Sequence, residues 1–339
     1  MATGSQIKAM MESHAEGDDS RFYSVASQVA ASEARKGHEK LAKEIRGLID
    51  TERSRAKLPS PKTLSDSVIS INRPDGEARE LVSLSTSRQT LDDLIVDSKV
   101  KADLQRGIKE QSHLGEILAH GLKPQKTFLF TGPPGCGKTM AASVVANSLN
   151  LPLFTVRLDA IITRFLGESS DKLRAVFEAI EKTRAVYLFD EFDSLGLERG
   201  SSQDVAEMRR VLNSFLVFVE SYKGNSIVIA ATNHAASLDF ALFRRFDSLI
   251  EFEMPTIEQS FKALTLRLSH VELPKNLNLK KIATAAEGLS FADLARIVDD
   301  SLKNVIIGQS KNLSTQLLLK ELQKRKQFLS KNHRVSSVS

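Results

Sequence analysis

The sequence predicts an α/β fold: a parallel sheet flanked by helices, followed by a small all-helical lid and preceded by a small helical N-terminal domain. Two observations lead to this prediction. Short apolar runs alternate with amphipathic helical segments through the middle of the chain, which is typical of a parallel sheet covered on both faces. After Pro255 these runs stop, and helical periodicity continues around residues 257–270, 277–286, 290–307 and 314–329.

The composition is that of an ordinary globular protein of 339 residues, with 41% hydrophobic and 26% charged side chains. No apolar run approaches the roughly 20 residues that cross a bilayer, and the N-terminus has no export-signal pattern, so we expect a cytoplasmic protein without membrane contact. The single cysteine, Cys136, excludes an internal disulfide. The net charge of +5 is mild and spread along the chain, which does not favour nucleic-acid binding.

Residues 1–55 are expected to form the helical N-terminal domain, because apolar side chains recur at helical spacing, as at Phe22, Val25 and Val29. This domain fits a packing appendage and a docking domain for a partner or substrate equally well. Residues 56–87 are rich in proline, serine and mixed charge, which predicts a linker with one short strand near 68–71.

The α/β part is expected over residues 88–255. A helical approach ends near Gly121 and Pro124, and a helix with Leu173, Val176, Phe177 and Ile180 on one face follows the second strand. The lid is expected over 256–330, with a capping box at Ser290 for its third helix. A disordered tail is expected over 331–339. The predicted strands are 127–131, 153–157, 185–189, 227–231 and 249–252.

A glycine-rich loop follows the first predicted strand and leads into a helix, and it matches G-x-x-x-x-G-K-[ST] without gaps. This is a P-loop: its backbone N–H groups cradle phosphate oxygens, the side chain of Lys138 reaches the β- and γ-phosphates, and the Thr139 hydroxyl ligates Mg²⁺. The sequence therefore predicts a site for a nucleoside triphosphate and Mg²⁺, formed by Gly132, Pro133, Pro134, Gly135, Cys136, Gly137, Lys138, Thr139 and Met140.

Polar residues end two further strands. Asp190 and Glu191 follow the run 185–189, in the form of a Walker B motif. We expect Asp190 to hold Mg²⁺ and Glu191 to orient and deprotonate the attacking water. Asn233 follows the run 227–231, where it either positions that water or caps the next turn.

Two adjacent arginines, Arg244 and Arg245, stand just before the last strand and close to Asp247. One interpretation is a surface ion pair with little effect on stability. The other is a pair of arginine fingers that stabilise transition-state charge on a neighbouring subunit's nucleotide.

In order along the chain, these motifs resemble the AAA family of AAA+ ATPases, and the resemblance runs from about residue 88 to 310. It implies ATP rather than GTP, a helical lid, and assembly into a ring that is commonly hexameric. It also implies sensor 1 at Asn233 and trans-acting fingers at Arg244 and Arg245. Phe291 stands where the family commonly has a second glycine, and at Ala292 the chain lacks the sensor-2 arginine of many AAA+ relatives.

The same resemblance places a pore loop at residues 164–168, where Phe165 and Leu166 would grip an extended polypeptide in the central channel. Taken alone, these two residues fit a buried pair before a glycine turn better. Segments 17–22 and 33–38 also resemble small bacterial AAA proteins with one ATPase module, some of which are paired with a subtilisin-like serine protease in phage-defence or toxin–antitoxin-like modules. We find no protease motif here, so a partner protease is expected to be a separate chain.

Two functions are open at this point. The first is an ATP-hydrolysing ring motor that remodels or threads protein substrates, in a homo-oligomer and with a possible partner protease. The alternative is an ATP-gated switch or scaffold that regulates a partner protein or nucleic acid. Its nucleic-acid form would use Lys324 and Lys326, which fit a solvated helix face better.

Overall fold

The computed structural model describes residue 74 and residues 76–85, 89–162, 168–192, 202–235, 243–271, 274, 276–308 and 312–336. The chain divides into two compact units, Met1–Ser70 and Ile71–Ser339, and all described residues belong to the second. The N-terminal domain expected over 1–55 and the strand expected near 68–71 lie outside the described residues.

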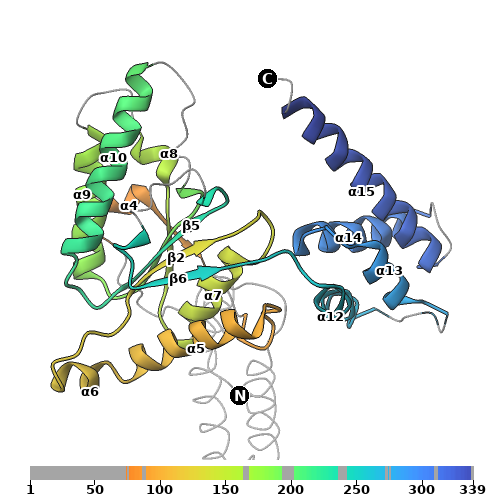
Figure 1. Cartoon of the computed structure of the whole chain (residues 1–339), viewed down its shortest axis with the longest axis horizontal. Helices are drawn as coiled ribbons and strands as arrows, with labels where there is room; N and C mark the ends of the chain where they lie inside the picture. The colour runs from red at the N-terminus through yellow and green to blue at the C-terminus, as the bar shows by residue number, and fades with distance from the viewer. Residues whose placement is uncertain are drawn as a thin grey trace, which may run out of the picture. The chain divides into compact units, whose positions relative to one another are not determined.

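The strands of the second unit form one sheet in the order β1-β3-β4-β5-β2-β6 (Figure 1). All neighbouring pairs are parallel except β1 with β3. The predicted parallel sheet is confirmed, with one antiparallel strand added at its edge. The strand bounds are β1 Val82–Ser85, β2 Thr127–Thr131, β3 Leu153–Val156, β4 Val186–Phe189, β5 Ile227–Thr232 and β6 Ser248–Glu251.

Alternate residues of the central strands face two separate cores, because successive side chains of a strand point to opposite faces. Leu129 and Tyr187 face one core, together with side chains of α9 and α10. Phe130 and Leu188 face the other, together with side chains of α5 and α7. Figure 1 shows these two pairs of helices on opposite faces of the sheet. The helix bounds are α4 Ala78–Leu81, α5 Ser98–Ser112, α6 Leu114–Ala119, α7 Lys138–Ser148, α8 Leu158–Ile161, α9 Glu168–Lys182 and α10 Ser202–Ser221.

Part of the predicted linker belongs to the α/β unit. Residues 78–85, inside the expected linker 56–87, form α4 and β1, and β1 pairs with β3 from Val82 opposite Val156 to Ser85 opposite Leu153. The strand has only four residues, and its apolar–polar alternation at Val82 and Leu84 was the available signal. The prediction was wrong here because serine-rich flanks masked so short a pattern.

The four predicted lid helices are confirmed as α12 Ile257–Arg267, α13 Leu279–Ala285, α14 Phe291–Ile306 and α15 Thr315–Ser336. They share a core that includes Leu264, Ile282, Val298 and Leu318. The capping box at Ser290 is also confirmed. The helix α15 continues to Ser336, past the expected start of the tail at residue 331, because no glycine or proline interrupts it. Among residues with described structure, no helix is both long and apolar enough to cross a membrane.

Candidate active site

The phosphate loop connects β2 to α7 at the carboxyl end of the sheet, as predicted. Two of its glycines are required by close contacts as well as by a left-handed backbone. A Cβ on Gly132 (φ 136°) would lie 2.0 Å from the carbonyl oxygen of Phe252. A Cβ on Gly135 (φ 77°) would lie 2.7 Å from Ser290 Oγ and 2.8 Å from Ala292 Cβ. The loop therefore has the close-packed glycine backbone that a phosphate cradle needs.

Lys138 is buried in this loop, and its ammonium group contacts oxygen atoms from two strands' ends. Its Nζ donates to the carbonyl oxygens of Gly132 at 2.7 Å and Pro133 at 2.9 Å, and to Asn233 Oδ1 at 2.8 Å. Because β5 lies beside β2 in the sheet, the residue after β5 reaches the loop after β2. The structure therefore brings Asn233 to the phosphate loop rather than leaving it as a remote turn cap.

Asp190 follows β4 and meets the start of α7. Thr139 Oγ1 donates to Asp190 Oδ2 at 2.7 Å. A hydroxyl and a carboxylate oxygen in contact fit Mg²⁺, which takes oxygen ligands and keeps several waters beside one or two protein groups. No cluster of three or more His, Cys, Asp or Glu that would suit a transition metal occurs in the part of the chain that the structure describes.

Glu191 has a left-handed backbone with φ 52°, which is uncommon for a residue other than glycine. Its N–H donates to Asp190 Oδ1 at 2.9 Å. The residues on either side of the two carboxylates, Phe189 and Phe192, are fully buried against Phe215 of α10. These aromatic anchors hold the strained turn in place, so the two carboxylates lie at a fixed point beside the loop.

Arg244 and Arg245 lie away from the phosphate loop of their own chain. Their position follows from that of Asp247, two residues after Arg245. Asp247 accepts hydrogen bonds from the backbone N–H groups of Lys126 and Thr127, at the amino end of β2. The phosphate loop leaves the other end of β2, about 13 Å away at the usual strand rise. Arg245 forms an ion pair with Glu220 of α10 rather than with Asp247.

The loop also contacts the lid. The N–H of Ala292 donates to the carbonyl oxygen of Gly135 at 3.2 Å. The capping residue Asp293 accepts from Ser290 Oγ at 2.7 Å and from Arg325 Nε of α15 at 2.7 Å. Burial raises the pKa of the Asp293 carboxyl, but these hydrogen bonds outweigh that effect, so its pKa lies below the ordinary value of 3.8.

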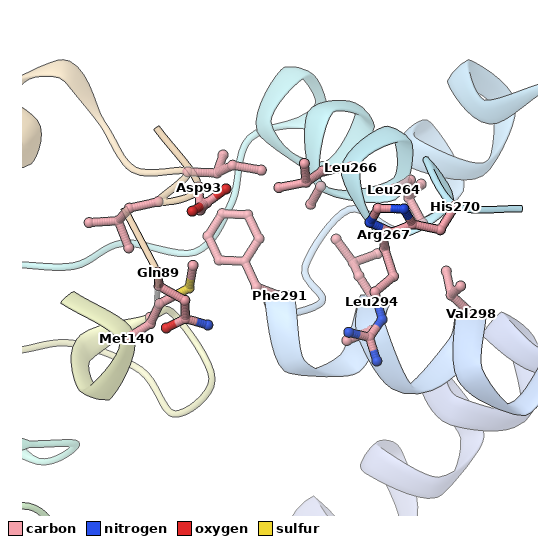
Figure 2. A pocket seen from close by; sticks show the side chains of 15 residues that line it. Gln89, Asp93, Met140, Leu264, Leu266, Arg267, His270, Phe291, Leu294 and Val298 are labelled. Carbon is pink, nitrogen blue, oxygen red and sulfur yellow. The ribbon is translucent and has the colours of Figure 1, made fainter. Parts of the chain in front are cut away.

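A cavity of about 530 Å³ adjoins the loop at Gly137 and Met140 (Figure 2). Its walls come from three parts of the chain: the segment before α5, with Asp93 and Leu94; the start of α7; and the lid helices α12 and α14. Its size suits a nucleoside. This cavity could not be predicted from the sequence, because its walls are far apart along the chain and carry no motif.

The predicted pore loop, with Phe165 and Leu166, lies outside the described residues. The structure thus brings Lys138, Thr139, Asp190, Glu191 and Asn233 to one edge of the sheet and places the two arginines elsewhere.

Cys136 is buried in the loop, where its Sγ lies 3.6 Å from Met254 Sδ.

Comparison with known proteins agrees with these features. Residues 128–254 match the family described as ATPase family associated with various cellular activities (AAA). An uncharacterized AAA family ATPase of Sinorhizobium fredii, y4kL, is 35% identical over 313 residues, which cover 92% of each protein. The proteasome-activating nucleotidase of Thermococcus kodakarensis is 35% identical over 228 residues, covering 60% of this chain and 57% of that protein. The ATP-dependent zinc metalloprotease FtsH 2 of Salinibacter ruber is 32% identical over 229 residues, covering 66% of this chain and 34% of that protein.

Proposed function

Because the chain belongs to the AAA family of ATPases, we propose that it is an ATP-hydrolysing ring motor that remodels or threads protein substrates. The observation that supports hydrolysis best is the contact network at the carboxyl edge of the sheet. Lys138 contacts Asn233, and Thr139 contacts Asp190, so residues from three strands converge on one phosphate loop.

In this proposal the chain's own groups divide the work of hydrolysis. The N–H groups of the loop and the Lys138 ammonium bind the phosphates. Thr139 and Asp190 would hold Mg²⁺, which would supply positive charge to the bound phosphates. Glu191 accepts a proton from the water whose oxygen attacks the γ-phosphorus, while the bond from that phosphorus to the bridging oxygen breaks and ADP leaves. The Asn233 amide orients the same water.

The cavity beside Gly137 would take the nucleoside, and the family supports ATP as its occupant. Asp93 lines this cavity. Hydrogen bonds from the backbone N–H and the hydroxyl of Thr90 hold the pKa of the Asp93 carboxyl below its usual range. An ionised carboxylate only accepts hydrogen bonds, and both adenine and guanine carry N–H donors for it, so Asp93 does not select ATP over GTP.

The position of the two arginines supports a ring. They lie about one strand length from their own phosphate loop, and Arg245 is paired with Glu220. An arginine finger must contact the γ-phosphate, so these residues are suited to act on a neighbouring subunit's nucleotide. We propose a homo-oligomer, hexameric as the family resemblance implies, in which hydrolysis depends on assembly.

Threading of a polypeptide is proposed for Phe165 and Leu166. Relatives named proteasome-activating nucleotidase and ATP-dependent zinc metalloprotease support a protein substrate, although this chain spans only part of each.

A partner protease and a phage-defence role are further parts of the proposal. They rest on the resemblance of the N-terminal segments to small bacterial AAA proteins. Equal plaque counts with the wild type and Lys138→Ala in a phage-challenged host would remove the defence role.

The alternative, an ATP-gated switch or scaffold, loses support in its nucleic-acid form. Lys324 forms an ion pair with Glu321, and Lys326 donates to the carbonyl oxygen of Glu287, so both lysines bond within the lid. A switch that acts on a partner protein makes the same use of ATP as a motor, and the pore loop is what distinguishes the two.

The proposal is tested by ATP turnover per subunit against protein concentration, with particle mass followed in parallel. We expect turnover to rise as a ring forms with ATP, and Glu191→Gln to abolish turnover while retaining assembly. Unfolded casein as a model substrate should stimulate the wild type but not Phe165→Ala. Flat turnover by a monomer would contradict the ring, and equal stimulation of Phe165→Ala would contradict threading.

A further inference from the structure

We propose that Phe291 is a specificity-determining residue whose ring stacks on the base of the bound nucleotide and selects a planar purine. This inference rests on the proposed binding of ATP and deepens it. Phe291 is the first residue of α14, and it lines the nucleoside-sized cavity beside the phosphate loop.

The backbone around Phe291 is held on both sides. Before it, Ser290 is buried, and its N–H and Oγ both donate to Asp293 Oδ2, at 3.0 and 2.7 Å. After it, the N–H of Ala292 donates to the carbonyl oxygen of Gly135 in the phosphate loop. The Phe291 Cα is therefore fixed relative to the loop that binds the phosphates, so ordering the ring on a base costs little further entropy.

The ring itself occupies the middle of the cavity wall. Figure 2 shows it between Asp93 and Met140 on one side and Leu266 and Leu294 of the lid on the other. Phe291 also lines a second, smaller cavity of about 30 Å³ next to Cys136 and Phe252, so it borders both spaces. The larger space lies on the side of Gly137, from which a nucleoside would extend away from the phosphates.

Phe291 is not simply a residue of the lid core. The core residues of the lid, such as Leu294 and Val298, are buried, whereas Phe291 is half-buried and only packs against them. Among the residues that line the larger cavity, the others on the phosphate-loop side are aliphatic or polar, and His270 belongs to the distant wall near Arg267 (Figure 2). Phe291 therefore offers the flat aromatic surface on which a base can stack near the loop.

Stacking predicts a measurable selectivity. An aromatic side chain that stacks on one base typically strengthens binding by about 5- to 150-fold. A purine offers a larger ring than a pyrimidine, so the wild type should prefer ATP to CTP. Inorganic tripolyphosphate has no base, so its affinity should not depend on Phe291.

The first test uses fluorescence, because the chain contains no tryptophan. Phe291→Trp places one reporter in the cavity, and Phe328→Trp places one at an exposed position of α15 as the matched control. We expect ATP to change the emission of the Phe291→Trp variant saturably, while tripolyphosphate leaves it unchanged and the control does not respond to either. Unchanged emission at an ATP concentration that calorimetry shows to be saturating would overturn the proposal.

The second test uses Phe291→Leu, which keeps an apolar side chain against the lid core but removes the aromatic face. Calorimetry should show ATP affinity reduced about 5- to 150-fold, a smaller ATP-to-CTP ratio, and unchanged affinity for tripolyphosphate. Unchanged or tighter ATP binding by this variant would overturn the role of Phe291 and leave ATP binding intact. Failure of the wild type to bind either ATP or tripolyphosphate would instead overturn the proposed function itself.

Discussion

The ammonium group of Lys138 lies 2.8 Å from Asn233 Oδ1, a hydrogen bond between residues 95 positions apart in the sequence. The contact joins the ends of two neighbouring parallel strands, β2 and β5. It shows how the sheet itself aligns the lysine to which we assign phosphate binding with the polar group to which we assign water positioning.

Asn233→Ala should separate binding from hydrolysis. Lys138 Nζ keeps two carbonyl acceptors in this variant, at Gly132 and Pro133, so ATP affinity should stay within a few-fold of the wild type. Turnover should fall about 10²-fold, the typical cost of losing one positioned polar group. Calorimetry and phosphate release measure the two quantities, and Asn304→Ala in the lid is the control. Equal losses in binding and turnover would show that Asn233 only supports the lysine.

Gly135→Ala should disrupt the contact between the phosphate loop and the lid. The new Cβ would meet Ser290 Oγ at 2.7 Å and Ala292 Cβ at 2.8 Å, in addition to the strain of a φ of 77°. Gly288→Ala is the matched control, because Gly288 has a φ of 80° but nothing within 4 Å of a new Cβ. The control should lose about 1–2 kcal/mol of unfolding free energy from backbone strain alone.

Denaturant unfolding and ATP affinity distinguish these two variants. Gly135→Ala should lose clearly more stability than Gly288→Ala, and it alone should lose ATP binding. Similar losses in both would mean that the loop and the start of α14 are not packed together in solution.

The ion pair of Asp293 with Arg325 should make the lid sensitive to acid. The pKa of the Asp293 carboxyl is depressed in the folded state. The contribution of this carboxyl to stability is therefore fully present above the ordinary pKa of 3.8 and is lost as the pH falls through the lower pKa of the folded state. The pair is mostly buried, with side-chain exposures of 10% and 19%, and removal of one partner leaves an uncompensated charge. Arg325→Met should therefore cost about 3 kcal/mol at pH 7, the lower end of the range for a buried ion pair that loses one partner.

Unfolding measured at pH 7 and at pH 3 tests this pair. The difference in stability between the wild type and Arg325→Met should shrink as the carboxyl is protonated. A difference that is the same at both pH values would assign the loss to the contact of the Arg325 guanidinium with the Phe328 ring instead.

Cys136 should react slowly with alkylating reagents at neutral pH. Burial raises the pKa of its thiol above the ordinary value of 9.0, and its side chain is 1% exposed. At pH 7 the fraction of thiolate is therefore even smaller than for a free cysteine. Because it is the only cysteine, the mass of the iodoacetamide-treated protein reports on it alone. Labelling as fast as in the urea-unfolded chain would contradict the buried position.

Much of the fold could be predicted from the sequence because the central strands are continuous apolar runs, such as Val186–Phe189, bounded by a glycine loop or by polar residues. The same pattern placed Asp190 and Asn233 at strand ends, and parallel strands bring such ends to one edge. By contrast, β1 has four residues and no apolar run, so local pattern reasoning missed it.

The remaining features depend on contacts between distant segments. The cavity has walls from residues 89–95, 137–140 and 263–298, and no local pattern links these segments. The pairing of Arg245 with Glu220, 25 positions earlier, likewise follows from how α10 packs beside the sheet. An ion pair with Asp247 was the alternative to arginine fingers at the sequence level, but that carboxylate bonds the start of β2 instead.

Hydrolysis that is shared between subunits can be restored by mixing two inactive variants. Lys138→Ala lacks phosphate binding but keeps both arginines, while a variant with Arg244→Ala and Arg245→Ala keeps a complete phosphate loop but lacks the fingers. Each should be inactive alone. We predict that a co-assembled mixture regains part of the wild-type turnover, because intact loops then face intact arginines across subunit boundaries. A mixture as inactive as its components, in particles shown by mass to contain both, would contradict the claim.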